Sequence, residues 1–119
     1  MEIKRLEANY SYDYRLDVIN IEVKEDYKYE LSIDLEAGVY LHFDENYFPV
    51  GLEIIDASKK MAIEKDFLLS PNGKVEVTIN DDSINVNVIF ENNNEKGLLH
   101  LNTFSEPYIP SLKTDFALV

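Results

Sequence analysis

The chain has 119 residues, of which 23 are acidic and 11 are basic, and its formal net charge is -12 at pH 7. This length suits a single domain, and an apolar content of 45% with 12% aromatic residues argues against a disordered chain despite the charge. The negative field argues against nucleic acid and anionic membranes as partners, and the lack of cysteine excludes disulfides, thiolate metal sites and thiol nucleophiles.

The same features indicate a cytoplasmic protein. A chain without cysteine suits a reducing compartment. Residues 1–7 carry positive charges but no apolar run follows them, and no stretch approaches the ~20 apolar residues of a membrane span. We therefore expect neither export nor membrane insertion.

Alternation of apolar and polar residues predicts a first group of strands. Polar residues 24–28 are few enough to form the turn of an antiparallel hairpin, and residues 44–46 form a later turn. Pro49 suggests an edge position or a strand start. The expected strands lie near residues 19–23, 30–36, 39–43 and 48–54.

The periodicity changes after Ile55, where a helix is expected near residues 56–67. Asp56 is a suitable N-cap residue, and the following apolar residues share one helix face. Those residues are Ala57, Met61, Ile63, Phe67 and Leu68. We expect this to be the one helix of the domain.

A second group of strands follows the turn residues 70–73. Strands are expected near residues 75–79, 84–90 and 99–101, which form a second meander. The remaining segment, residues 103–119, contains Pro107 and Pro110 but is too apolar for a solvated linker. It either packs on its own sheet or covers a neighbouring copy or partner.

The sequence therefore predicts one α+β domain over residues 1–119 that is mostly β. It has about eight short antiparallel strands in two meanders and one helix. The first meander and the helix occupy residues 10–69, the second meander occupies residues 74–102, and residues 103–119 form a docked apolar tail.

Tyrosines and carboxylates of the first half are the candidate binding residues. If the first strand pairs near the turn at Asp44, the carboxylates of the first half of the chain could converge into a cluster able to hold a hard cation. The alternative is that these acids serve turns and exposed strand faces. The candidates are Tyr12, Asp13, Asp17, Asp44 and Glu53.

Enzymatic motifs are missing from the sequence, which favours a protein that is not an enzyme. His42 and His100 each lie between apolar neighbours and should face outward from strands. The four glycines stand apart, so no phosphate loop is formed, and no serine has the context of a nucleophile elbow. We assign no catalytic residue, metal ligand or cofactor.

Several short motifs resemble a prokaryotic family of uncharacterised small proteins, the domain of unknown function twenty-two eighty-three. The resemblance covers about residues 10–60 and rests on the order of Tyr12-Asp13, Asp17-Val18-Ile19, Phe43-Asp44-Glu45, Gly51-Leu52-Glu53-Ile54 and Asp56-Ala57-Ser58. It implies a compact antiparallel sheet with a short helix, no assigned activity and, in some members, a setting beside small toxin-like proteins. The chain departs from the family at 18–19, where Leu-Tyr is frequent, and at 46–47, where Asp-Gly or Asn-Gly is usual.

Three functional hypotheses follow. The first is a non-enzymatic protein-interaction module that binds, or neutralises, a small basic toxin-like partner through its acidic face and tyrosine-rich first half. The second is a carboxylate-based protein that binds divalent metal ions or catalyses hydrolysis. The third is a self-assembling structural homodimer closed by the C-terminal tail.

Overall fold

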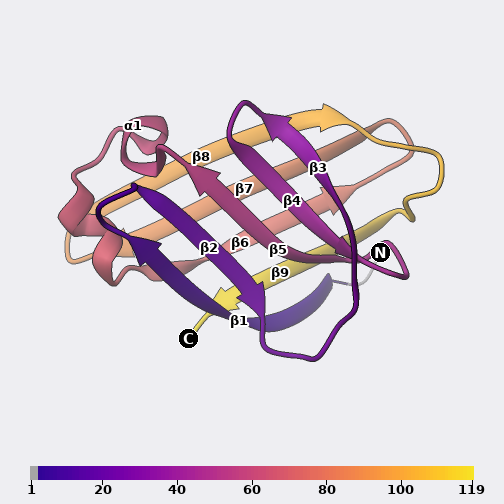
Figure 1. Cartoon of the computed structure of the whole chain (residues 1–119), viewed down its shortest axis with the longest axis horizontal. Helices are drawn as coiled ribbons and strands as arrows, with labels where there is room; N and C mark the ends of the chain where they lie inside the picture. Colours follow the sequence, from indigo (N-terminus) through magenta and orange to yellow (C-terminus); the bar gives the residue numbers. More distant parts are fainter. Residues whose placement is uncertain (1–2) are drawn as a thin grey trace.

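The computed structural model describes residues 3–119, which form nine strands, one short α-helix and one 3-10 helix (Figure 1). The elements are β1 (Ile3–Asp13), β2 (Val18–Val23), β3 (Tyr29–Glu36), β4 (Val39–Asp44), β5 (Pro49–Ile55), α1 (Ala57–Met61), η1 (Lys65–Leu69), β6 (Asn72–Ile79), β7 (Ser83–Asn92), β8 (Glu95–Phe104) and β9 (Leu112–Leu118). The strands belong to a single sheet in the order β3-β4-β5-β2-β1-β9-β6-β7-β8.

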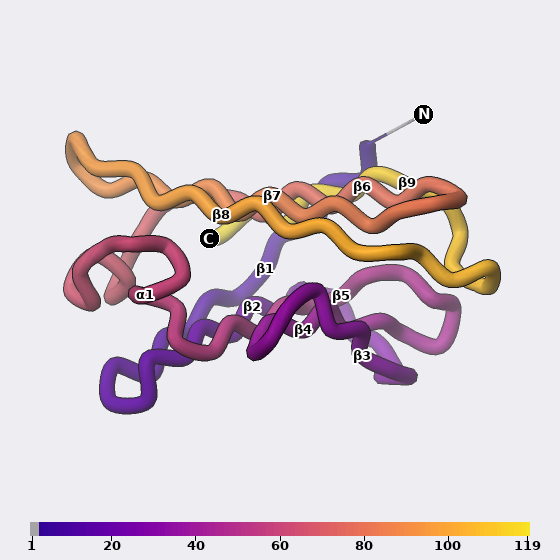
Figure 2. Tube along the Cα trace, turned by 90° about the horizontal axis from the view of Figure 1, so that it is seen from above, coloured from indigo at the N-terminus to yellow at the C-terminus, as the bar shows by residue number. Residues whose placement is uncertain are grey.

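The sheet folds over into two layers, as Figure 2 shows, and β1 passes from one layer to the other. Residues 3–8 of β1 pair in parallel with β9, whereas residues 8–13 pair antiparallel with β2. Ala8 takes part in both ladders and is fully buried, so its small side chain lies where the strand changes layers. The edge strands β3 and β8 approach each other, and the sheet nearly closes on itself.

Alternating side chains fill the space between the layers. In β7, for example, Ile84, Val86, Val88 and Phe90 are at most 1% exposed, while the residues between them face outward. The ring of Phe90 contacts Tyr10 of β1 edge to face, with centroids 5.6 Å apart. The two-residue period therefore places one shared core between the layers.

The short helices close one end of this core, where Met61, Phe67 and Leu68 are buried. The predicted helix near 56–67 is too long, because Ala62 adopts a left-handed conformation with a φ of 54°. The backbone N–H of Ala62 and that of Ile63 donate back to Lys59 and Ser58, which ends α1 after one turn. The predicted cap is also wrong, since the Asp56 side chain makes no capping hydrogen bond.

The mostly β prediction and its two meanders agree with the structure in outline. The strands β3, β4 and β5 are sequential neighbours, and so are β6, β7 and β8. The expected hairpin between β2 and β3 is wrong, because β2 pairs with β1 on one side and β5 on the other. The expectation of purely antiparallel pairing is wrong for β1 and β9.

The C-terminal tail is part of the sheet. Its strand β9 lies between β1 and β6, so this segment packs in its own chain. Within residues 3–119, no helix has both the length and the apolar character needed to cross a bilayer.

Candidate functional site

One layer of the sheet contains the neighbouring strands β3, β4, β5 and β2. A hollow lies on the outer face of this layer, over Gly51 of β5. Gly51 pairs with Glu22 of β2 on one side and with His42 of β4 on the other. Glycine has no side chain, so the outward-facing side chains of Glu22 and His42 are separated by a gap above Gly51. The hollow has a volume of about 310 Å³, and its lining consists of Asn20, Ile21, Glu22, Tyr27, Tyr29, His42 and Gly51.

The floor of the hollow requires glycine. A Cβ atom added at Gly51 would lie 2.9 Å from the backbone oxygen of Ile21 and 3.3 Å from Cδ2 of His42. The first of these distances is shorter than a van der Waals contact, and the obstacle is backbone that cannot rotate away. The imidazole of His42 therefore lies against the space that Gly51 leaves open.

A chain of hydrogen bonds holds the imidazole of His42 in place. Its Nδ1 atom lies 2.6 Å from the hydroxyl oxygen of Ser32 on the neighbouring strand, and that oxygen lies 2.7 Å from the hydroxyl of Tyr29. The Tyr29 ring also meets the imidazole edge to face, with centroids 6.0 Å apart. Burial lowers the pKa of His42, and the charges of Glu53 and Glu22 oppose this shift without reversing it. The lowered pKa favours the neutral form of the imidazole at pH 7.

Tyr27 fixes the carboxylate on the opposite side of the hollow. Its hydroxyl donates a 2.8 Å hydrogen bond to Oε1 of Glu22. Burial of the phenol, together with this hydrogen bond and the charge of Glu22, raises the pKa of Tyr27 to about 12. One carboxylate oxygen is thus used by Tyr27, and no hydrogen bond from residues 3–119 occupies the other.

The hollow can bind a cationic group. Two tyrosine rings supply aromatic walls, Glu22 supplies a negative charge and His42 supplies a neutral imidazole, around a floor of backbone. Guanidinium groups bind well in such surroundings, because they stack on aromatic rings and donate hydrogen bonds to a carboxylate. Among residues 3–119, no three His, Cys, Asp or Glu side chains are grouped so that they could hold a metal ion.

The structure brings together two of the sequence-predicted candidates, Tyr12 and Asp17. The Tyr12 hydroxyl donates to Oδ1 of Asp17 at 2.6 Å. Asp17 is only 5% exposed, and its carboxylate also accepts from the backbone N–H and the hydroxyl of Ser58. Asp17 is therefore a buried residue of the β1–β2 turn and does not lie on an exposed strand face.

The remaining candidates, Asp13, Asp44 and Glu53, lie at three separate places along β5. Asp13 accepts a hydrogen bond from the backbone of Leu16 in the β1–β2 turn, near the end of β5. Asp44 accepts from the backbone of Asn46 and Phe48 just before β5 begins, at the other end of that strand. Glu53 lies between them, on the outer face of β5 and two residues from Gly51.

Sequence reasoning did not identify most residues around the hollow. His42 does face outward from a strand, as predicted, but its partners Ser32 and Tyr29 follow from the register of β3 and β4. The available signal was Gly51 itself, because an isolated glycine inside an apolar strand indicates a close approach of backbone.

Comparison with known proteins adds a family for this part of the chain. Residues 9–58 match the family model described as Protein of unknown function (DUF2283). The match contains all residues that line the hollow and excludes the second meander. The chain matches no curated protein and no solved structure. The predicted resemblance to this family of proteins of unknown function is confirmed over residues 9–58, which are fewer than half of the chain.

Proposed function

We propose that the chain is a non-enzymatic protein-interaction module that binds a basic protein through the outer face of β2, β5, β4 and β3. The observation that carries this proposal is the hollow over Gly51, where Glu22 and two tyrosine rings surround a floor of backbone. An arginine side chain of the partner would enter it and pair with Glu22. Arginine and tyrosine are among the residues that contribute most to binding energy at interfaces.

The charge of the chain supports the same class of partner. The net charge of -12 attracts cationic proteins over long range and accelerates their encounter. Near the hollow, Glu53 adds a second carboxylate on the same face of β5. A small basic toxin-like protein is the partner that the family resemblance suggests.

The alternatives have less support. The carboxylates expected to form a metal or hydrolytic site lie at separate places around β5. The C-terminal segment expected to close a homodimer is a central strand of its own sheet. Neither arrangement supplies an observation that favours the corresponding function.

A capped arginine peptide tests the proposed contact directly. Titration of the 15N-labelled protein with blocked Gly-Arg-Gly should shift the amide signals of Gly51, Glu22 and Tyr29, and the shifts should weaken as salt increases. The same peptide with citrulline in place of arginine should produce no shifts, because citrulline has no charge. Equal shifts with both peptides, or shifts spread evenly over the surface, would contradict the proposal.

Matched variants separate the local contact from the overall field. The double substitution Glu22→Gln and Glu53→Gln removes two negative charges from the outer face. The substitutions Glu95→Gln and Glu106→Gln remove two charges from exposed positions in the second half of the chain. The first pair should abolish binding of the arginine peptide, while the second pair should leave it close to wild type. Equal losses would show that net charge alone is responsible.

A further inference from the structure

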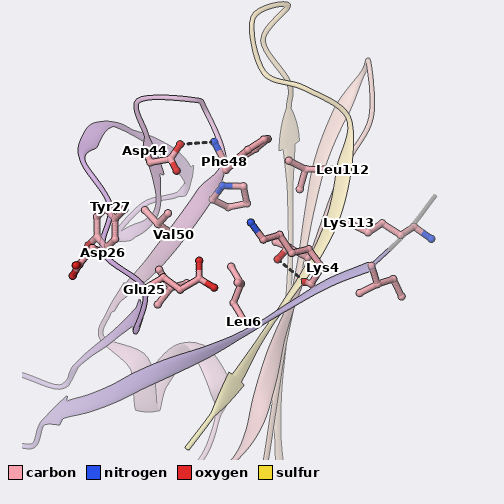
Figure 3. Close-up of a pocket in the computed structure, with 14 residues that line it drawn as sticks. Lys4, Leu6, Glu25, Asp26, Tyr27, Asp44, Phe48, Val50, Leu112 and Lys113 are labelled. Carbon is pink, nitrogen blue, oxygen red and sulfur yellow. Dashed lines mark hydrogen bonds between the residues drawn. The ribbon is translucent and has the colours of Figure 1, made fainter.

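A second cavity (Figure 3) opens beside the β4–β5 turn, which lies at the end of the molecule opposite α1 in Figure 1. Its volume is about 420 Å³, which is within the range of small-molecule sites, roughly 300–1,000 Å³. One wall comes from β1 and β9, and the other comes from the β2–β3 loop and the β4–β5 turn. This cavity is separate from the hollow over Gly51 and shares only Tyr27 with it.

The path of β1 creates the cavity. On the N-terminal side of Ala8, β1 pairs with β9 and no longer with β2, so the two layers diverge toward the N-terminal end of β1. The side chains of Leu6, Val23 and Val50 lie at the base of the resulting wedge and are at most 9% exposed. An apolar floor is therefore available to a ligand.

The two walls carry opposite charges. Lys4 and Lys113 belong to the wall formed by β1 and β9, whereas Glu25, Asp26 and Asp44 belong to the facing wall. Figure 3 shows the charged ends of Lys4 and Glu25 directed into the space between the layers, while that of Lys113 points away from it.

Contacts within the described chain position Lys4, but no ion pair within it neutralises either Lys4 or Glu25. The hydroxyl of Thr114, a residue that is 3% exposed, donates a 2.8 Å hydrogen bond to the backbone oxygen of Lys4. The Lys4 ammonium lies 5.7 Å from the centre of the Phe48 ring. Neither Lys4 nor Glu25 forms a salt bridge with any of residues 3–119.

We propose that this cavity binds a small zwitterion with an apolar body, of the class of apolar amino acids and short apolar peptides. The ligand carboxylate pairs with Lys4, its ammonium pairs with Glu25, and its apolar side chains contact Leu6 and Val50. A simple anion that pairs with Lys4 would be repelled by Glu25. A simple cation that pairs with Glu25 would be repelled by Lys4. A dipolar ligand satisfies both walls.

Leucyl-leucine is a suitable probe for titration of the 15N-labelled protein at low ionic strength. Saturable shifts are expected for the amides of Leu6, Val50 and Phe48. N-acetyl-leucyl-leucine lacks the ammonium, and leucyl-leucine amide lacks the carboxylate, so both should bind about fivefold more weakly, as expected for loss of one exposed charge pair. The absence of saturable shifts, or equal affinity for all three compounds, would overturn the proposal.

Charge-removing variants identify the contacts. Lys4→Met should weaken leucyl-leucine binding about fivefold and abolish the preference for a free carboxylate, and Glu25→Gln should do the same for the ammonium. Lys96→Met and Glu106→Gln make the same changes at exposed positions away from the cavity and should bind as wild type does. If the control variants lose as much affinity as Lys4→Met and Glu25→Gln, the site is elsewhere and the proposal fails.

Discussion

The hydroxyl of Tyr12 donates a 2.6 Å hydrogen bond to Oδ1 of Asp17, across the turn that joins β1 to β2. The same carboxylate accepts hydrogen bonds from the backbone N–H and the hydroxyl of Ser58, at 3.0 and 2.7 Å. The backbone oxygen of Asp17 accepts from Ala57 at 3.0 Å. Asp17 therefore satisfies the first turn of α1 from a distant part of the chain, which is the role that the sequence assigned to Asp56.

Asp17→Asn should lower the free energy of unfolding by about 2 kcal/mol, because an amide can replace one acceptor oxygen but not the other, and the hydrogen bonds lose their charge. Urea unfolding followed by circular dichroism measures this change. Asp34→Asn removes the same charge at an exposed position of β3 and should change stability by less than about 0.5 kcal/mol. Equal effects of the two substitutions would show that the hydrogen bonds of Asp17 contribute nothing beyond charge.

The contribution of Asp17 should depend on pH. Burial by itself would raise the pKa of Asp17, but the hydrogen bonds from Tyr12 and Ser58 and the charge of Lys65 outweigh it, so the pKa lies below its usual value. A lowered pKa in the folded state stabilises the protein above the unfolded pKa of about 3.9, and this stabilisation is lost as pH falls through the folded pKa. The difference in unfolding free energy between wild type and Asp17→Asn should therefore be full at pH 6 and decrease below about pH 4. A difference that is the same at pH 6 and pH 3 would contradict this assignment.

Alternation in the sequence predicted many strand positions and the faces that they bury, because those properties depend on neighbouring residues. It did not predict which strands are partners. The hairpin expected between β2 and β3 does not form, since β2 is enclosed by β1 and β5. Likewise, the contact between Asp17 and Ser58 joins residues 41 positions apart, and only the folded chain brings them together.

The C-terminal tail also contains a local strand pattern, in β9. Leu112, Thr114, Phe116 and Leu118 alternate with more polar or smaller residues, and Phe116 is fully buried in β9. The sequence predicted only that this stretch belongs to a docked apolar tail that contains Pro107 and Pro110. The central position of β9 between β1 and β6 depends on pairing with residues near the N-terminus, and a local sequence pattern does not indicate such distant pairing.

Alanine substitutions at Gly51 and Gly97 compare crowding against backbone atoms with crowding against side-chain ends. Gly51→Ala places Cβ 2.9 Å from the backbone oxygen of Ile21, and adjustment of the sheet should cost about 1–3 kcal/mol. At Gly97 an added Cβ would meet the ends of the Ile63, Met61 and Phe67 side chains, at 3.0 to 3.2 Å. Ile63 and Met61 can change rotamer, so Gly97→Ala should cost less. Thermal or urea unfolding of both variants measures the difference, and a smaller loss at Gly51 would contradict the close backbone approach.

Tyr47 occupies a left-handed conformation that suits glycine better than a residue with a side chain. Its φ is 62°, which costs a side chain about 1 kcal/mol or more. Its ring packs against Tyr108, with centroids 5.0 Å apart. Tyr108 lies in the connection between β8 and β9, and we expect its contact with Tyr47 to offset the backbone strain at Tyr47.

A double-mutant cycle tests this balance. Tyr47→Gly alone should change the free energy of unfolding by less than about 0.5 kcal/mol, because relief of the backbone strain offsets loss of an aromatic contact worth about 0.5–1.5 kcal/mol. In a Tyr108→Ala background that contact is already absent, so Tyr47→Gly should stabilise the protein by about 0.5–1 kcal/mol, after allowance for the greater freedom of glycine in the unfolded chain. If Tyr47→Gly destabilises both backgrounds equally, Tyr47 is held by contacts other than Tyr108, and the strain at this turn is compensated elsewhere.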